Sequence, residues 1–162
     1  MDGLSFEDKD IKNGYLRVTG NMEGYFVYTL FRGNNSDTVV EQRTGCGPEC
    51  EQEFIVHVFK NGKLTANPKF EDLYPKKKLD KHLISLINKI PNGPNGETPQ
   101  TWIRLPKFER SIDLLVVDQN PGATRGQASV YRVGVLTWNG NSFDFKKMSL
   151  LKPSNIKIQD VH

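Results

Sequence analysis

The sequence predicts an α+β fold dominated by antiparallel strands, in which two meanders pack as a sandwich or a partial barrel with one main helix. Three observations lead to this prediction. Short segments rich in β-branched and aromatic residues recur along the chain between turn residues. The dipeptide Asn-Gly, which suits two-residue hairpins, separates strand-like segments at 61–62 and 139–140. One segment, 76–90, has apolar residues at helical spacing.

The first part of the chain predicts an antiparallel meander. Residues 1–13 are polar and lack periodicity, so they are expected to be irregular. In the longest predicted strand, Phe54, Val56 and Val58 fall on one face. The predicted strands are 15–19, 25–31, 38–43, 51–59 and 63–65.

The helix at 76–90 is predicted from leucines at helical spacing. Leu79, Leu83 and Leu86 share one face, and Pro91 ends the run. Three lysines open this helix and oppose its dipole, so they are expected to form a solvated patch.

The second half returns to strands after a loop at 91–100. The predicted strands are 101–105, 111–117, 128–138, 142–145 and an edge strand at 156–158. Both halves contain a long apolar strand followed by Asn-Gly. Two interpretations stay open: a single domain over 1–162 in which common hairpins recur, and an internal duplication of 14–65 and 101–147 joined by the helix at 76–90 and the loop at 91–100.

Composition indicates a folded domain and excludes several classes. Of 162 residues, 36% are hydrophobic and 25% charged. The net charge of +3 is too small to predict a nucleic-acid partner. No apolar run approaches the roughly 20 residues of a transmembrane segment. Neither a nucleophile-elbow motif nor a phosphate-binding glycine loop occurs. We therefore expect a non-enzymatic protein without a cofactor.

The loop Gly45-Cys46-Gly47-Pro48-Glu49-Cys50 contains both cysteines of the chain. Its glycines and proline favour a tight turn that brings the two thiols within bonding range. A structural disulfide, a redox pair and half of a metal site are all compatible with this spacing. The absence of a following helix and the acidic neighbours disfavour the redox pair.

A metal site needs ligands besides Cys46 and Cys50. The histidines are His57, His82 and His162, and His57 is the nearest in sequence. Two thiolates and one imidazole suit zinc or copper. His57 is also explained as an ordinary residue on one strand face, so no metal is expected.

Aromatic residues are dense near the N-terminus. Tyr15, Tyr25, Phe26, Tyr28 and Phe31 predict either a stacking platform for sugars or bases, or the core-facing side of a sheet.

The segment 22–50 with its Cys-Gly-Pro-Glu-Cys loop, the hairpin at 59–64 and the hairpin at 136–140 resemble uncharacterised exported or lipoprotein-like, β-rich proteins of the bacterial envelope. The resemblance implies an extracytoplasmic domain (periplasmic, secreted or lipid-anchored) with a disulfide between Cys46 and Cys50. No signal peptide is visible at the N-terminus, so we expect the leader to have been removed. The resemblance implies no activity.

Three hypotheses of function follow. The first is a non-enzymatic binding or accessory module of the bacterial cell envelope, whose partner is an unidentified protein or small ligand. The second is an extracytoplasmic thiol-redox or metal-binding protein that uses Cys46 and Cys50. The third is an inhibitor of a secreted hydrolase that inserts the loop at 46–50. The sequence does not define an oligomeric state.

Overall fold

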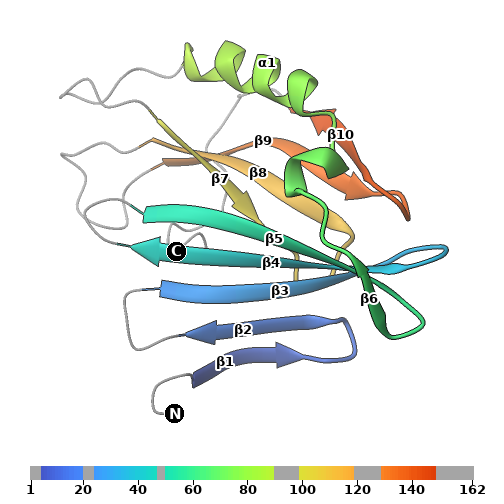
Figure 1. Cartoon of the computed structure of the whole chain (residues 1–162). Helices are drawn as coiled ribbons and strands as arrows, with labels where there is room; N and C mark the ends of the chain where they lie inside the picture. Colours follow the sequence, from blue (N-terminus) through green and yellow to red (C-terminus); the bar gives the residue numbers. More distant parts are fainter. Residues whose placement is uncertain (1–4, 20–23, 47–49, 90–98, 119–128, 149–162) are drawn as a thin grey trace.

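The computed structural model describes residues 5–19, 24–46, 50–89, 99–118 and 129–148, with the backbone alone at 5, 46, 118 and 129. These residues form two antiparallel sheets and one α-helix (Figure 1). The predicted β-dominated α+β class is therefore confirmed, and the described strands form two open sheets.

The first sheet is a six-stranded meander whose strands are neighbours in sequence order. Its strands are β1 (Ser5–Asp10), β2 (Tyr15–Thr19), β3 (Gly24–Arg32), β4 (Asp37–Cys46), β5 (Cys50–Lys60) and β6 (Lys63–Ala66). Phe54 and Val58 pack against the core and Val56 is buried, as the alternation in β5 predicts.

Strand β1 corrects the prediction that residues 1–13 are irregular. It pairs with β2 from Ser5 opposite Thr19 to Asp10 opposite Tyr15. As an edge strand it is polar, and its one large apolar side chain, Phe6, is 71% exposed. Hydrophobic periodicity is therefore absent, because backbone pairing and charged side chains hold this strand in place.

The second sheet has four strands in the order β10-β9-β8-β7. Its strands are β7 (Gln100–Arg104), β8 (Ser111–Asp118), β9 (Ser129–Trp138) and β10 (Phe143–Lys147). These bounds agree with the prediction within two residues. The predicted edge strand at 156–158 lies outside the described residues.

The helical region contains a 3₁₀ turn, η1 (Phe70–Leu73), and the helix α1 (Lys76–Ile87). Figure 1 shows α1 beside β10. Leu79 and Leu86 are buried in the core, while the three lysines at the start of α1 are exposed, as expected. The helix ends earlier than predicted: the N–H of Asn88 makes the last bond of helical spacing, to the carbonyl of Ile84, and the N–H of Lys89 closes a tighter turn by donating to the carbonyl of Leu86.

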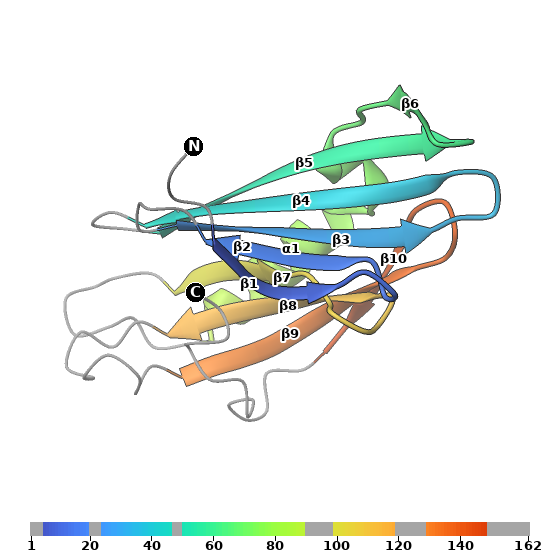
Figure 2. The same ribbon diagram turned by 90° about the horizontal axis from the view of Figure 1, so that it is seen from below.

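The two sheets lie one over the other and share a core (Figure 2). Phe31 of β3 packs edge-on against Phe143 of β10, with ring centroids 5.0 Å apart, and lies 5.7 Å from the ring of Trp138. The Trp138 Nε1–H donates to the carbonyl of Arg32 at 2.9 Å. An aromatic cluster thus joins the hairpin of the second sheet to the centre of the first.

The two Asn-Gly hairpins differ in geometry. Asn61 and Gly62 have φ angles of 53° and 73°, so β5 and β6 are joined by the predicted type I′ turn. Trp138 pairs with Phe143, so the second loop has four residues, and Asn139 Oδ1 accepts the backbone N–H of Ser142 at 3.0 Å. The duplication of 14–65 and 101–147 stays a prediction. None of the helices in the described ranges has the length and apolar character needed to cross a membrane.

Candidate functional site

A cleft of about 470 Å³ lies where the β7–β8 hairpin approaches the inner faces of β2, β3 and β4. We call it the inter-sheet cleft. Its size is within the range of small-ligand sites. Its lining residues are Tyr15, Arg17, Tyr25, Val27, Gln42, Ile103, Arg104, Leu105, Pro106, Lys107, Phe108, Glu109, Ser111, Asp113 and Arg132.

The second sheet contributes a carboxylate held between two guanidinium groups. Asp113 on β8 is 8% exposed. Its Oδ2 accepts a hydrogen bond from Arg104 Nη2 at 2.5 Å, and its Oδ1 lies 2.5 Å from Arg132 Nη2. The second contact has the distance of an ion pair without the angle of a hydrogen bond. Two cations thus share one anion, which leaves an excess positive charge at this point of the cleft.

A β-bulge brings Arg132 to this position. Arg104 is the register partner of Asp113, but Arg132 pairs with Leu115, after a register shift at Leu114 and Leu115. Asp113 and Leu115 alternate onto the same face of β8, so the shift places Arg132 on that face too. Without the bulge, Arg132 would pair with Val116 and its side chain would lie on the opposite face of the sheet from Asp113.

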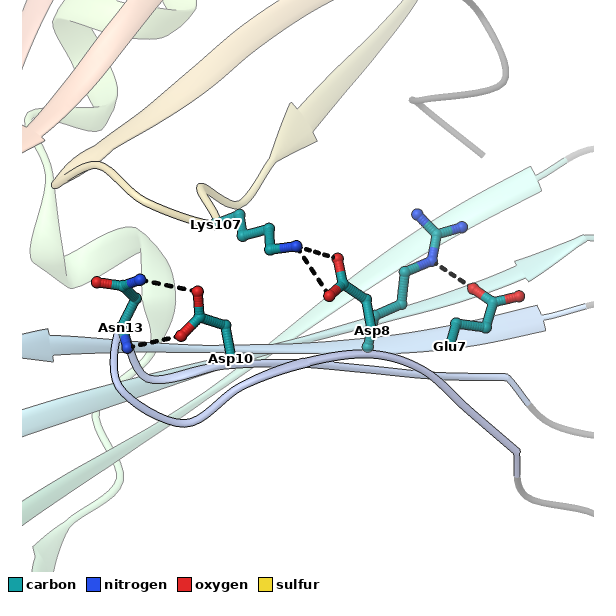
Figure 3. A network of polar contacts seen from close by, with 6 residues as sticks. Glu7, Asp8, Asp10, Asn13 and Lys107 are labelled. Atoms are coloured by element: carbon teal, nitrogen blue, oxygen red, sulfur yellow. Dashed lines mark hydrogen bonds and ion pairs between the residues drawn. The ribbon is translucent and has the colours of Figure 1, made fainter.

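Ion pairs connect two residues that line the cleft, Arg17 and Lys107, to acidic residues of β1 (Figure 3). Lys107 of the β7–β8 hairpin points toward β1, where its Nζ lies 2.8 Å and 2.7 Å from the two carboxylate oxygens of Asp8. Hydrogen bonding to Asp8 raises the pKa of Lys107 above its usual value, so the ammonium stays charged. Arg17 donates to Glu7 at 2.8 Å, and its guanidinium carbon lies 4.3 Å from the centroid of the Tyr25 ring.

The tyrosines of the cleft are neutral hydrogen-bonding groups. Burial raises the pKa of both Tyr15 and Tyr25, so their phenols stay protonated at neutral pH. Gln42 Nε2 lies 3.5 Å from the Tyr25 oxygen and donates to Thr44 Oγ1 at 3.1 Å. General acid–base catalysis favours a pKa near the working pH, and these shifts move the phenols away from it. At neutral pH both phenols are therefore neutral groups that can donate and accept hydrogen bonds.

The two cysteines face each other in the backbone register. Cys46 pairs with Cys50 at the last position of the β4–β5 ladder. Cys50 packs against a buried cluster that contains Trp102. The side chain of Cys46 and residues 47–49 lie outside the described part of the chain, so the disulfide, the redox pair and the inhibitory loop all stay predictions.

The structure does not bring His57 to the cysteines. β5 is continuous from Cys50 to Lys60, so seven residues at about 3.3 Å each separate Cys50 and His57 by about 23 Å. His57 Nε2 instead lies 3.4 Å from Glu41 Oε2. His82 Nε2 donates to the carbonyl of Val133 at 2.8 Å, and His162 lies outside the described residues. Among the described side chains no group of three or more His, Cys, Asp or Glu is arranged to hold a metal.

The aromatic residues near the N-terminus separate into different environments. Tyr15 and Tyr25 line the inter-sheet cleft, whereas Phe31 fills the core. Phe26 and Tyr28 alternate with Tyr25 and Phe31 along β3 and are half-buried on the other face of that strand. Two of the five predicted aromatics therefore belong to the candidate site.

The charged residues of the cleft were not predicted from the sequence. Arg17, Arg104 and Arg132 come from three separate strands, and Lys107 comes from a hairpin. One signal was present: Arg17 has the same strand parity as Tyr15, which places a charge on an inward face. Nothing in the local pattern indicates the bulge that aligns Arg132.

No protein-family model, no curated protein and no solved structure matches the chain. The resemblance to proteins of the bacterial envelope therefore stays a prediction, and the inter-sheet cleft carries the functional argument.

Proposed function

We propose that this chain is a non-enzymatic binding module that holds a small ligand in the inter-sheet cleft. The observation that carries the proposal is the cleft itself, about 470 Å³ in volume, into which side chains of both sheets converge. Ligand sites of this size combine apolar walls with a few placed polar groups. Here the walls are aromatic and aliphatic, and the polar groups include Gln42 and Ser111.

An exposed aromatic ring at the cleft supports the same proposal. Phe108, in the β7–β8 hairpin, is 69% exposed although it lines the cleft. The hairpin is held in place, because Thr29 donates to the carbonyl of Pro106 at 3.1 Å and Lys107 binds Asp8. A hairpin held in this way presents the ring at the cleft, where it offers an apolar contact for a ligand.

The proposal is tested by filling the cleft. Ser111 lines it, whereas its neighbour Arg110 is exposed and is not among the lining residues. A fragment library is screened by backbone amide NMR against the wild type, Ser111→Trp and Arg110→Trp. We expect fragments to shift the amides of cleft residues in the wild type and in Arg110→Trp, and to lose this effect in Ser111→Trp. Fragments that shift only residues elsewhere contradict the proposal.

We further propose that the module works outside the cytoplasm, in the bacterial envelope, with Cys46 and Cys50 joined as a disulfide. The backbone register supports the bond, because directly opposed residues of an antiparallel pair have Cα atoms about 4.5–5.5 Å apart, within the disulfide range. The test combines free-thiol titration, intact mass without reductant and elemental analysis. We expect no free thiol and no metal. Two reactive thiols, or stoichiometric metal, overturn the disulfide and favour the redox or metal hypothesis.

A further inference from the structure

We infer that the ligand of the inter-sheet cleft is an anion with an aromatic or other flat apolar body, bound head-first at Arg104 and Arg132. This inference rests on the proposed function and specifies its ligand class. The anionic head is a carboxylate, sulfonate or phosphate, which share the chemistry of an oxyanion that accepts hydrogen bonds from guanidinium groups.

The positive charges of the cleft differ in how they are paired. Arg17 and Lys107 each have an acidic partner, Glu7 and Asp8 respectively. Arg104 and Arg132 share the single carboxylate of Asp113. Glu109 also lines the cleft, but among the described residues the two arginines form ion pairs only with Asp113, so the positive charge is in local excess at this pair. A cationic ligand meets repulsion there, and a neutral ligand leaves the excess uncompensated.

Arg132 also has an unused hydrogen-bond donor. Arg132 Nε is buried and has no hydrogen-bond partner among the described residues. Buried polar groups are nearly always hydrogen-bonded in native proteins, so this guanidinium group has an unused donor. The Arg132 side chain as a whole is 36% exposed and lines the cleft, so a ligand can reach the group at its exposed nitrogens. Asp113 already contacts one guanidinium nitrogen of Arg104 and one of Arg132, which an external oxyanion also needs. It acts as an internal anion with which the ligand competes.

Aromatic rings near the arginines indicate a ligand with an apolar body. The rings of Tyr15, Tyr25 and Phe108 line the same cleft as the arginines, together with aliphatic side chains of the β7–β8 region. Lys107 Nζ lies 5.0 Å from the Phe108 centroid, so positive charge also borders the exposed ring. A flat apolar group is therefore able to contact rings while its anionic head reaches the arginines.

The experiment uses two fluorescent dyes of nearly the same ring system. Anilinonaphthalene sulfonate carries a negative charge, and phenylnaphthylamine is neutral. Both are titrated by fluorescence into the full chain, its Arg132→Gln and Asp113→Asn variants, and the control Arg110→Gln, an exposed arginine of the same hairpin outside the lining. We expect the sulfonate to bind the wild type at least about tenfold more tightly than the neutral dye, the difference contributed by one charge-assisted interaction.

The two variants are expected to change affinity in opposite directions. Arg132→Gln weakens sulfonate binding about tenfold, because a charged donor is lost. Asp113→Asn strengthens it several-fold, because the competing anion is removed. The neutral dye changes little in either variant, and Arg110→Gln behaves as the wild type. Partial unfolding raises the binding of both dyes, so a gain confined to the sulfonate cannot come from misfolding.

The outcomes separate the two proposals. Equal binding of both dyes, lost in Ser111→Trp, overturns the anionic class and leaves the binding module standing. Sulfonate binding that Asp113→Asn weakens, or that Arg132→Gln leaves unchanged, also overturns the anionic class. If neither dye binds, or if both bind regardless of Ser111→Trp, the inference fails and the cleft itself loses support as a ligand site.

Discussion

Among single residues, Gln52 takes the place of a strand neighbour between the two sheets. Its Nε2 donates to the carbonyl of Ile103 at 2.9 Å, and its Oε1 accepts the N–H of Ile103 at 2.9 Å. Ile103 belongs to β7, the edge strand of the second sheet as far as the described residues form it. The side-chain amide thus covers the free edge at this point, where unpaired backbone groups otherwise invite pairing with another chain.

Replacing Gln52 by alanine is expected to lower the free energy of unfolding by about 2 kcal/mol, because both backbone groups of Ile103 lose their partner. The measurement is urea denaturation followed by circular dichroism. Glu53→Ala is the matched control: its side chain is 67% exposed, so a change below about 0.5 kcal/mol is expected. Equal small effects in the two variants contradict this role of Gln52.

Tyr74 makes the stability of the protein fall at alkaline pH. Burial, with smaller effects of Glu71 and Asp80, raises the pKa of Tyr74 from 10.0 to about 12. Between these two values the unfolded chain has released the phenolic proton while the folded chain retains it. The unfolded state then binds fewer protons, so the free energy of unfolding decreases as pH rises through this window.

We expect this tyrosine to account for a loss of about 1–2 kcal/mol between pH 10 and pH 12, allowing for its partial exposure. Tyr74→Phe retains the edge-on contact with Phe70, whose ring lies 5.3 Å away, and removes the titrating group. Urea unfolding at about pH 9 and about pH 11 measures the slope. The variant is expected to have a shallower fall than the wild type, and an identical slope excludes this assignment.

Among elements, the bulge in β9 links the helix to the inter-sheet cleft. Val133 has no register partner on β8, and its carbonyl accepts hydrogen bonds from His82 Nε2 of α1 and from the N–H of Met148. The bulge puts the adjacent Arg132 on the face of Asp113. α1 contributes no side chain to the lining of the cleft, but it helps to hold the backbone next to Arg132, which does line the cleft.

We expect His82→Phe to lower the free energy of unfolding by about 1 kcal/mol, because one of the two donors to the Val133 carbonyl is lost. A phenyl ring preserves the contact with Phe145, whose centroid lies 5.6 Å from that of His82. Backbone amide NMR is expected to show shifts at Arg132 and Val133. Lys81→Gln, an exposed neighbour on α1, controls for general changes in the helix. Unchanged shifts at Arg132 contradict the link.

Prediction from the sequence succeeded where one element carries its own signal. Alternation at Phe54, Val56 and Val58 and the Asn-Gly turn at 61–62 are local features, and both are confirmed. β1 was missed because Phe6 is exposed and its pairing depends on backbone groups and ion pairs. The cleft was missed for a related reason: the position of Arg132 depends on a register shift between two strands, which neither strand encodes alone.

At the level of the whole molecule, the two sheets depend on each other for burial. One cluster of buried side chains includes Val40 and Val56 from the first sheet, Leu136 and Phe143 from the second, and Leu79 from α1. A sheet needs a covered apolar face to be stable, and each sheet supplies that cover for the other. This arrangement supports the prediction that 1–162 unfolds as one unit, although the sequence also suggests two similar halves.

Phe31→Leu tests that prediction, because Phe31 belongs to the first sheet and both tryptophans, Trp102 and Trp138, belong to the second. The smaller side chain leaves space beside Trp138 and Phe143, so a loss of about 1–2 kcal/mol and a decrease of a few degrees in Tm are expected. If the sheets unfold together, tryptophan fluorescence and far-ultraviolet circular dichroism report the same shifted transition in thermal unfolding. Ile84→Ala, at a residue of α1 that is 61% exposed, is expected to leave both signals nearly unchanged. Separate transitions in the two signals after Phe31→Leu favour two units, as an internal duplication with independently stable halves requires.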